Sequence, residues 1–552
     1  MHRSRIVAVV VPLLLVLAAG TARVVLLGHP DRIIFDETYY VEDARSYLDQ
    51  GVEHGFAVHP PVGKWLIAAG IAVAGDEPFG WRISTAVAGT LLVLLTYLIG
   101  LRLLRWRGAA ALAGLLAAVD GLLFVQSRTS MLDIFLAMFV ALGAWLLLVD
   151  RDRSGLARRR DGRAMRTVGD RAVPAGGSVD EPPADDRTVA AGWATTVASD
   201  RSTTGGQTAA QQPPSDVAHV PRRGHAFRVA AGAAFGLAVA TKWSALLALA
   251  AGVLVTAGWE LAWRRRLTGQ PTAMLGRLIA SLAVAFVLVP AGVYVASYVP
   301  WLINYEHTTE GRDVCRGERP CQVSIPGRLA GLWRYQLAIA NFHTDLDAEH
   351  PYRAPAYTWP VIGRPMVYYW ENCDRQRAAG VATRTDEGEL VEPDPCRVAP
   401  GNAGEIIALG NPGLWWVALG ALVPLAAGAA RRDGRAWFVV AFWGAQFLPW
   451  LVVSLPGVPF SRPLFFFYMT PIVPFLALAV AYGVVWLDET VERVATRRTV
   501  TLPRTSVTPG AVVGALVGLV AVGLFVYFYP VLAGVELPEA AVRQRWWFDA
   551  WV

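Results

Sequence analysis

The sequence predicts an all-α polytopic membrane protein with about 11 transmembrane helices, each long enough to cross a bilayer. Three observations lead to this fold class. The 552 residues are 54% hydrophobic and only 17% charged, whereas soluble domains carry about 25% charged residues. Apolar runs of about 20 residues recur along the chain. Arginine clusters follow alternate runs, as expected for loops that share one side of a membrane. Soluble globular, fibrous and wholly disordered classes are therefore excluded.

The apolar segments are long enough to cross about 30 Å of hydrocarbon as helices. The first one resembles a signal peptide, but its apolar run is long and Ala19-Gly20-Thr21-Ala22 is a poor cleavage site. We therefore expect a retained signal anchor. The predicted spans are 6–27, 83–101, 109–126, 131–149, 227–241, 243–263, 278–300, 413–430, 436–455, 463–486 and 508–530.

The arginine clusters give the predicted orientation of these spans. Arg102, Arg105 and Arg107 follow the second span, and Arg431 and Arg432 follow the eighth. Because positively charged loops remain in the cytoplasm, we expect a multi-pass plasma-membrane protein whose arginine-rich side is cytoplasmic. This bias accounts for the net charge of +6, so no nucleic-acid partner is expected.

The spans and loops divide the chain into five predicted regions. One of them, residues 151–226, is rich in Arg, Asp, Gly, Ser, Thr and Pro, and is predicted to be a disordered cytoplasmic insert. The others are the N-terminal transmembrane helices 1–150 with a first external loop at 28–82, the transmembrane helices 227–300, a large external loop 301–412, and the C-terminal transmembrane helices with an external tail, 413–552.

All four cysteines lie in the large external loop, at Cys315, Cys321, Cys373 and Cys396. Disulfides persist in oxidising compartments, so this distribution agrees with the predicted orientation. Four cysteines allow three pairings, and sequence proximity favours Cys315–Cys321 with Cys373–Cys396. A zinc site is the alternative, but the chain has no close Cys-x-x-Cys pair, and no metal ligand is predicted.

Ionisable residues near the external ends of the spans are the candidate functional residues, because charge at a bilayer centre costs about 2.5–3.5 kcal/mol. Asp36 and Glu37 form an adjacent acid pair just after the first span. Neighbouring side chains point in different directions, so one of the two is expected to face a reaction centre as a general base. The alternative is that Asp36 only caps the helix that follows.

His59 and Lys64 lie in the segment His59-Pro60-Pro61-Val62-Gly63-Lys64, which predicts a tight turn followed by a short apolar helix. This helix is too short to span a membrane and would lie in the interface. Lys64 would then meet lipid headgroups and could bind a phosphate with help from the helix N-terminus. The alternative is an ordinary turn with a lysine that extends to the membrane surface.

Three further cations lie at predicted external turns. Arg128, between Asp120 and Asp133, would bind a phosphate bidentately or else pair with an aspartate to hold a helix hairpin. Lys242 and Arg462 each lie alone at a turn, and simple interfacial anchoring is the alternative for both.

In the large loop, His350 and Tyr352 precede a run of aromatic residues. Such side chains suit sugar stacking and hydrogen bonding, or a loop that lies flat on the membrane.

Together these segments resemble the protein O-mannosyltransferase family of membrane glycosyltransferases with the C-type fold, and its actinobacterial branch in particular. The match covers most of the chain except the insert. The matching pieces are Phe35-Asp36-Glu37-x-x-Tyr40, His59-Pro60-Pro61-x-Gly63-Lys64, Asp120-Gly121 through Ser127-Arg128 to Leu132-Asp133, Gly236-Leu237 through Thr241-Lys242-Trp243, His350-Pro351-Tyr352 with Trp359-Pro360, Gly410-Asn411-Pro412 with Trp415-Trp416, and Arg462 with Phe467-Tyr468 and Pro471.

The resemblance implies transfer of mannose from polyprenyl-phosphate mannose to Ser or Thr hydroxyls of secreted or membrane proteins, by one inverting displacement at the external membrane face. Asp36 would be the catalytic base, and Glu37 would position acceptor or sugar. Substrate or its lipid phosphate would meet His59, Lys64, Arg128, Asp133, Lys242, His350, Tyr352 and Arg462.

No cofactor is required, and a divalent metal is an open alternative that is not predicted, because the basic residues can neutralise the phosphate. Expected partners are the lipid-linked donor, the polypeptide acceptor, membrane lipids and, as a further candidate, the secretion translocon. The alternative function is a C-type transferase that modifies a lipid or cell-wall glycan with aminoarabinose or arabinose. A glycolipid flippase is disfavoured, because it would need ionisable groups reaching both faces, whereas here they gather at one.

Overall fold

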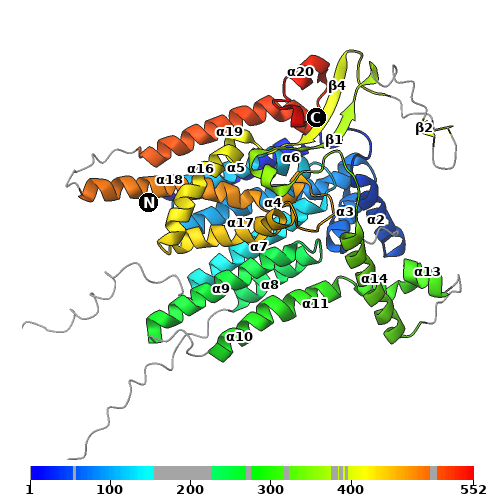
Figure 1. The fold of residues 1–552 in the computed structure, drawn as a ribbon, viewed down its shortest axis with the longest axis horizontal. Helices are drawn as coiled ribbons and strands as arrows, with labels where there is room; N and C mark the ends of the chain where they lie inside the picture. Colours follow the sequence, from blue (N-terminus) through cyan, green and yellow to red (C-terminus); the bar gives the residue numbers. More distant parts are fainter. Residues whose placement is uncertain are drawn as a thin grey trace, which may run out of the picture.

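The computed structural model describes residues 2–53, 58–154, 225–268, 275–315, 323–374, 383–384, 390–391, 396–497 and 507–551. Its long helices run in similar directions, as Figure 1 shows, and small elements gather at one end of them, on the right in that view. We call this the sheet end. The other end carries Arg105, Arg151 and Arg432 at helix ends or just beyond them, and we call it the arginine end.

Eight described stretches of helix are long and apolar enough to cross a membrane, which agrees with the predicted class. They are α4 (Pro78–Leu104), α7 (Leu132–Arg153), α9 (Ala245–Thr268), the run of α10 (Leu275–Ala283), η2 (Val284–Leu288) and α11 (Val289–Ala296), α16 (Pro412–Ala430), α17 (Gly434–Val453), α18 (Val473–Arg497) and α19 (Pro509–Ala533). The other three predicted spans correspond to shorter apolar stretches, which are Val9–Val24 within α1 (His2–Val24), α5 (Arg107–Ala118) and α8 (Ala226–Val239). Most of the predicted insert lies outside the described residues.

Two predicted spans are interrupted. Asp120 separates α5 from α6 (Gly121–Gln126), because its carboxylate accepts a hydrogen bond from Leu123 N at 2.9 Å and starts a new helix there. Its other oxygen accepts from Asn411 N and from the Trp415 indole, at 3.1 and 2.8 Å. The predicted span 463–486 begins later than expected. The prolines of 463–472 disfavour a helix there, and α18 begins only after η5 (Phe466–Met469).

The large loop adds a few short strands to a protein that is otherwise helical, as predicted. It contains α12 (Val299–Ile303), η3 (Tyr305–His307), α13 (Thr309–Cys315), α14 (Ile325–Asp345), η4 (Ala356–Val361), β1 (Met366–Glu371), the ribbon of β2 (Thr383–Arg384) with β3 (Leu390–Val391), and β4 (Asn402–Ala408). β1 pairs antiparallel with β4, and β4 pairs with β5 (Leu537–Pro538), which precedes α20 (Glu539–Arg543) and η6 (Asp549–Trp551). The aromatic run of β1 suits a strand.

The disulfide Cys373–Cys396 is present and connects the segment that follows β1 to the segment that precedes β4. This confirms one of the two predicted pairings. Cys315 ends α13, but its predicted partner Cys321 lies outside the described residues.

Buried charge is not restricted to the sheet end, contrary to the prediction. Near the arginine end, Arg228 of α8 bonds Asp150 of α7 at 3.0 Å and Glu260 of α9 at 2.8 Å. All three side chains are buried. Because each charge has an opposite partner, this cluster connects three helices rather than offering a site for a ligand.

Candidate functional site

A cavity of about 270 Å³ opens at the sheet end, between the beginnings of α7 and α9 and the ends of α14 and α17. Segments far apart in sequence build it, and four of its residues are predicted site residues. It is lined by His59, Asp133, Leu136, Lys242, Trp243, Ser244, Leu247, His343, Gln446, Trp450, Phe460, Arg462, Tyr468 and Pro471.

The His-Pro-Pro segment reaches this cavity because it packs directly on the turn between α8 and α9. Val62 N donates to Ala240 O at 3.0 Å, just as α3 (Val62–Ala74) begins. A Cβ at Gly63 would lie 2.7 Å from the Leu132 side chain and 3.0 Å from the Thr241 methyl group. Only glycine allows so close an approach, and this packing places His59 near Lys242.

Lys242 and Asp133 form an ion pair in the wall of the cavity. The ammonium group lies 2.8 and 3.0 Å from the two carboxylate oxygens of Asp133. It also lies 5.6 Å from the ring centroids of Phe467 and Tyr468, within the range of cation–π attraction. Lys242 is therefore not the isolated interfacial anchor of the alternative hypothesis, but its charge is largely balanced by Asp133.

The net positive charge of the cavity comes from Arg462, because Lys242 and Asp133 balance each other. Its guanidinium bonds His343 Nδ1 and lies 3.3 Å from the Tyr468 hydroxyl. Burial and the charges of Arg462 and Lys242 lower the pKa of His343 to about 4, so the imidazole is neutral and can accept from Arg462. Within the described residues no carboxylate pairs with Arg462, and the cavity therefore favours an anion.

His59 adds a polar group without adding charge. Burial, followed by the charge of Lys242, lowers its pKa well below the usual value. Its Nδ1 is buried and has no hydrogen-bond partner within the described residues. A neutral imidazole with an unpartnered nitrogen in a cavity wall can donate to, or accept from, a bound hydroxyl.

Asp36 lies beside the cavity at the start of α2 (Glu37–Gln50). Its side chain makes no capping hydrogen bond, so the helix-capping alternative was wrong. Burial raises the pKa of Asp36 to about 6, with Lys242 lowering and Asp133 raising it. The preceding residue, Phe35, is held in the left-handed region with φ +49° and stacks on Tyr368 at 4.3 Å. A half-buried carboxylate that ionises near neutrality, beside a cationic cavity, suits a general base.

Comparison with known proteins identifies the family. Residues 58–154 match the family described as dolichyl-phosphate-mannose-protein mannosyltransferase, and 328–551 match the C-terminal four-transmembrane region of protein O-mannosyltransferase. The polyprenol-phosphate-mannose–protein mannosyltransferase of Mycolicibacterium smegmatis is 31% identical over 550 residues, covering 97% of this chain and 91% of the relative. The chain belongs to the protein O-mannosyltransferase family.

Two further comparisons agree with this membership. The polyprenol-phosphate-mannose–protein mannosyltransferase of Mycobacterium tuberculosis is 30% identical over 538 residues, covering 94% of this chain and 86% of the relative. Among solved structures, the Pmt1-Pmt2 complex of S. cerevisiae with bound sugar donor aligns with a TM-score of 0.66 at 12% identity, covering 98% of this chain and 92% of the other. At that identity the likeness shows the fold alone, which is the C-type membrane glycosyltransferase architecture.

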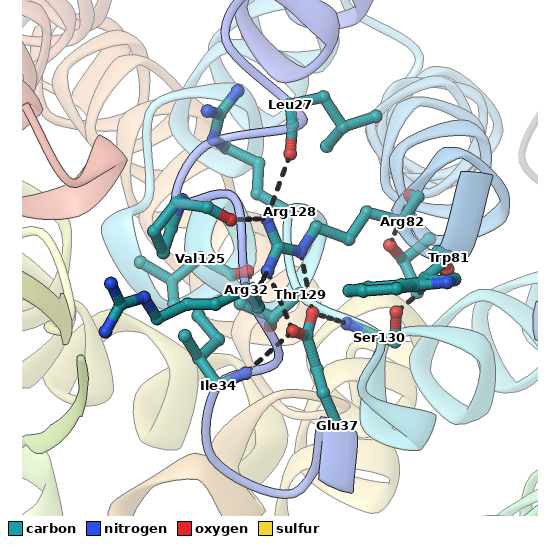
Figure 2. Close-up of polar contacts among 12 residues, drawn as sticks. Leu27, Arg32, Ile34, Glu37, Trp81, Arg82, Val125, Arg128, Thr129 and Ser130 are labelled. Carbon is teal, nitrogen blue, oxygen red and sulfur yellow. Dashed lines mark hydrogen bonds and ion pairs between the residues drawn. The ribbon is translucent and has the colours of Figure 1, made fainter. Parts of the chain in front are cut away.

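Glu37, the second acid of the pair, faces away from the cavity. Its carboxylate forms two bonds with Arg82, at 2.7 and 2.8 Å. It also accepts from Ile34 N at 3.1 Å and Ser130 N at 2.9 Å. Figure 2 shows these contacts converging on one carboxylate. Glu37 and Arg82 are fully buried, so we infer that in this family member Glu37 fixes the loop before α2 and thereby orients Asp36.

The Arg128 guanidinium is hydrogen-bonded to the C-terminal end of α1. It donates to four carbonyl oxygens in or just beyond the last turn, Ala22 O at 3.4 Å, Arg23 O at 2.8 Å, Val25 O at 2.5 Å and Leu26 O at 2.7 Å. Helix C-termini favour such cations. The sequence predicted either a phosphate contact or an Arg–Asp pair for Arg128, and the guanidinium instead bonds backbone carbonyls. Arg128 does not line the cavity.

Lys64 is completely buried, which corrects the prediction that it meets lipid headgroups. Its ammonium lies 2.8 Å from the Asp43 carboxylate and also bonds Glu53. Asp43 belongs to α2, and Glu53 follows that helix. The three charges thus join α2 to α3, and two carboxylates already satisfy the lysine.

His350 and Tyr352 lie outside the cavity lining. Tyr352 N donates to His350 Nδ1 at 3.2 Å, and the His350 ring packs edge-on against Phe465 at 4.9 Å. The guanidinium of Arg364 lies 5.5 Å from the Tyr352 ring. These contacts shape the loop next to the site.

His343 was missed by the sequence interpretation. It sits near the end of α14, in Asn341-Phe342-His343, and no motif singles it out. Its role depends on how the large loop folds back over the cavity. Among the described residues, no group of three or more His, Cys, Asp or Glu side chains is arranged to hold a metal ion.

Proposed function

We propose that this protein transfers mannose from polyprenyl-phosphate mannose to a Ser or Thr hydroxyl of a polypeptide. The observation that carries the proposal is the half-buried Asp36 carboxylate beside a cavity whose net charge is positive. The names of the actinobacterial relatives support the donor and the protein acceptor. The family membership supports the reaction class.

The reaction needs two contributions from the site, a base for the acceptor hydroxyl and positive charge for the departing phosphate. The acceptor hydroxyl must lose a proton, and Asp36 accepts it as the new bond forms between that oxygen and C1 of mannose. The bond from C1 to the phosphate oxygen breaks in the same step, so the configuration at C1 inverts. The departing phosphate takes the bonding electrons, and its charge is stabilised by Arg462, with Lys242 contributing less because Asp133 already balances it.

The arginine clusters support a site on the extracytoplasmic face. The cavity lies at the sheet end, and the arginine-rich turns at the opposite end are the ones that the positive-inside rule assigns to the cytoplasm. On that side the donor's lipid chain stays in the membrane while the acceptor arrives from outside. A polypeptide leaving the secretion translocon would meet the cavity in an extended form.

The experiment that tests the acceptor class uses membranes containing the protein and radiolabelled polyprenyl-phosphate mannose. A Ser/Thr-rich peptide and an isolated lipid fraction are offered as acceptors in parallel. We expect label on the peptide. Label on lipid alone would favour the aminoarabinose-type alternative, whose named relative in Pseudomonas paraeruginosa matches only 22% of this chain. A cysteine-accessibility measurement that places the 28–53 loop in the cytoplasm would contradict the proposed face.

A further inference from the structure

A second cavity, of about 840 Å³, lies at the arginine end. Asp133 lines the first cavity at the beginning of α7, and Arg151 lines the second near the end of the same helix. At 1.5 Å per residue these positions are separated by roughly 27 Å, close to the thickness of the hydrocarbon layer. The second cavity is therefore at the other membrane surface, too far away to take part in sugar transfer.

The rim of this cavity carries two arginines that have no partner among the residues that the structure describes. Arg105 directly follows α4, and Arg432 lies two residues after α16. Both side chains are exposed, and within the described residues neither guanidinium has a hydrogen-bond or ion-pair partner. Both residues hold the left-handed conformation, with φ +58° and +59°, at positions where helices usually place glycine. Two arginines that are unpaired in the described part of the chain thus line one opening.

The other two arginines of the cavity are already satisfied. Arg435 bonds Asp433 and Glu489 at distances of 2.7–2.9 Å. Arg151 bonds Asp152 at 2.9 Å and lies 5.2 Å over the Trp259 ring. The positive charge that is free to meet a ligand therefore comes from the two rim arginines.

The walls of the cavity are largely apolar and include exposed side chains. Trp259 of α9 stacks on Phe438 of α17 with 3° between the ring planes, and Trp437 and Leu254 on the same two helices are 53% and 66% exposed. A small soluble anion would gain nothing from such walls. A molecule with an anionic head and an apolar chain would use both the rim and the walls.

We propose that this cavity binds an anionic membrane phospholipid from the leaflet at the arginine end. The phosphate headgroup lies between Arg105 and Arg432, and an acyl chain lies along Trp259 and leaves between α9 and α17. The lipid connects α4, α9 and α17, and the opposite ends of α9 and α17 line the first cavity. This site is independent of the proposed reaction.

Native mass spectrometry of the full chain in a neutral detergent tests the proposal, with palmitoyl-oleoyl phosphatidylglycerol as the probe and the matching phosphatidylcholine for comparison. Each arginine near an anionic headgroup contributes about 1 kcal/mol, so Arg105→Gln with Arg432→Gln should weaken phosphatidylglycerol binding about 30-fold. The matched control changes Arg107 and Arg431, which lie in the same loops but do not line the cavity, and should weaken it less than twofold.

A third variant separates shape from charge. Gly258 lines the cavity, and a Cβ there would meet no atom within 4 Å. Gly258→Leu keeps every charge, improves helix propensity and fills the space, so it should also abolish tight phosphatidylglycerol binding. Equal weakening in the Arg107/Arg431 control, binding of phosphatidylcholine as tight as that of phosphatidylglycerol, or displacement of the lipid by millimolar inorganic phosphate would each overturn the proposal.

Discussion

Replacing Glu37 by Gln removes one charge from a fully buried ion pair and leaves the size of the side chain unchanged. The glutamate accepts two bonds from Arg82 and one each from Ile34 N and Ser130 N. The amide of glutamine keeps one acceptor oxygen but turns a donor toward other donors, and the Arg82 charge remains buried without its partner. Breaking such a pair costs about 3–5 kcal/mol, so the variant should unfold at a clearly lower temperature.

The assay is thermal denaturation of the purified chain in detergent, read together with transfer at a temperature where the variant is folded. Asp31→Asn is the matched control, because Asp31 pairs with Arg397 at 3.0 Å while 75% and 52% of the two side chains are exposed. That change should cost less than about 1 kcal/mol. A Glu37→Gln protein as stable as the wild type, but with transfer reduced at least about 100-fold, would refute the structural role.

Other expected outcomes follow from the same contacts. The transfer rate should rise with pH through about 6 and level off above it, because burial raises the pKa of Asp36 to about 6 and only the ionised carboxylate accepts a proton; a rate that is constant from pH 5 to 8 would contradict this. Arg128→Gln should lower the denaturation temperature and leave the donor KM unchanged, since the arginine caps α1; a selective rise in KM would restore the phosphate role. Arg462→Gln should raise the donor KM at least about tenfold, as expected for a lost charge-assisted bond, whereas Arg364→Gln, outside the cavity, should not. Transfer should survive removal of divalent metal by a chelator, and loss that Mg²⁺ or Mn²⁺ restores would contradict the metal-free reaction.

Much of the architecture could be predicted from local sequence. Long apolar runs define the helices, and the alternation of arginine clusters orders their ends. Charged residues at the external turns pointed to Asp133, Lys242 and Arg462, which do share one cavity. The sheet could not be predicted in this way, because β1 and β4 pair across about 30 intervening residues and each strand is short.

The roles of individual charged residues could not be predicted, because they depend on partners that come into contact only in the folded protein. Lys64 is satisfied by Asp43 and Glu53, which come from neighbouring segments only after α2 folds against α3. Arg128 bonds backbone carbonyls, which carry no sequence signal at all. His343 reaches the cavity only because α14 is held there by the fold of the large loop. Tertiary contacts, not residue type, separate a functional cation from a structural one.

The most direct measurement compares Asp36→Asn with the wild type in donor binding and in single-turnover transfer to a Ser/Thr peptide. Asparagine keeps the shape of the side chain but cannot accept the hydroxyl proton. We expect donor affinity to stay within about twofold and the transfer step to slow by about 10²–10⁴-fold, with Asp31→Asn unchanged in both. Transfer by Asp36→Asn at the wild-type rate would contradict the assignment of Asp36 as the base of this reaction.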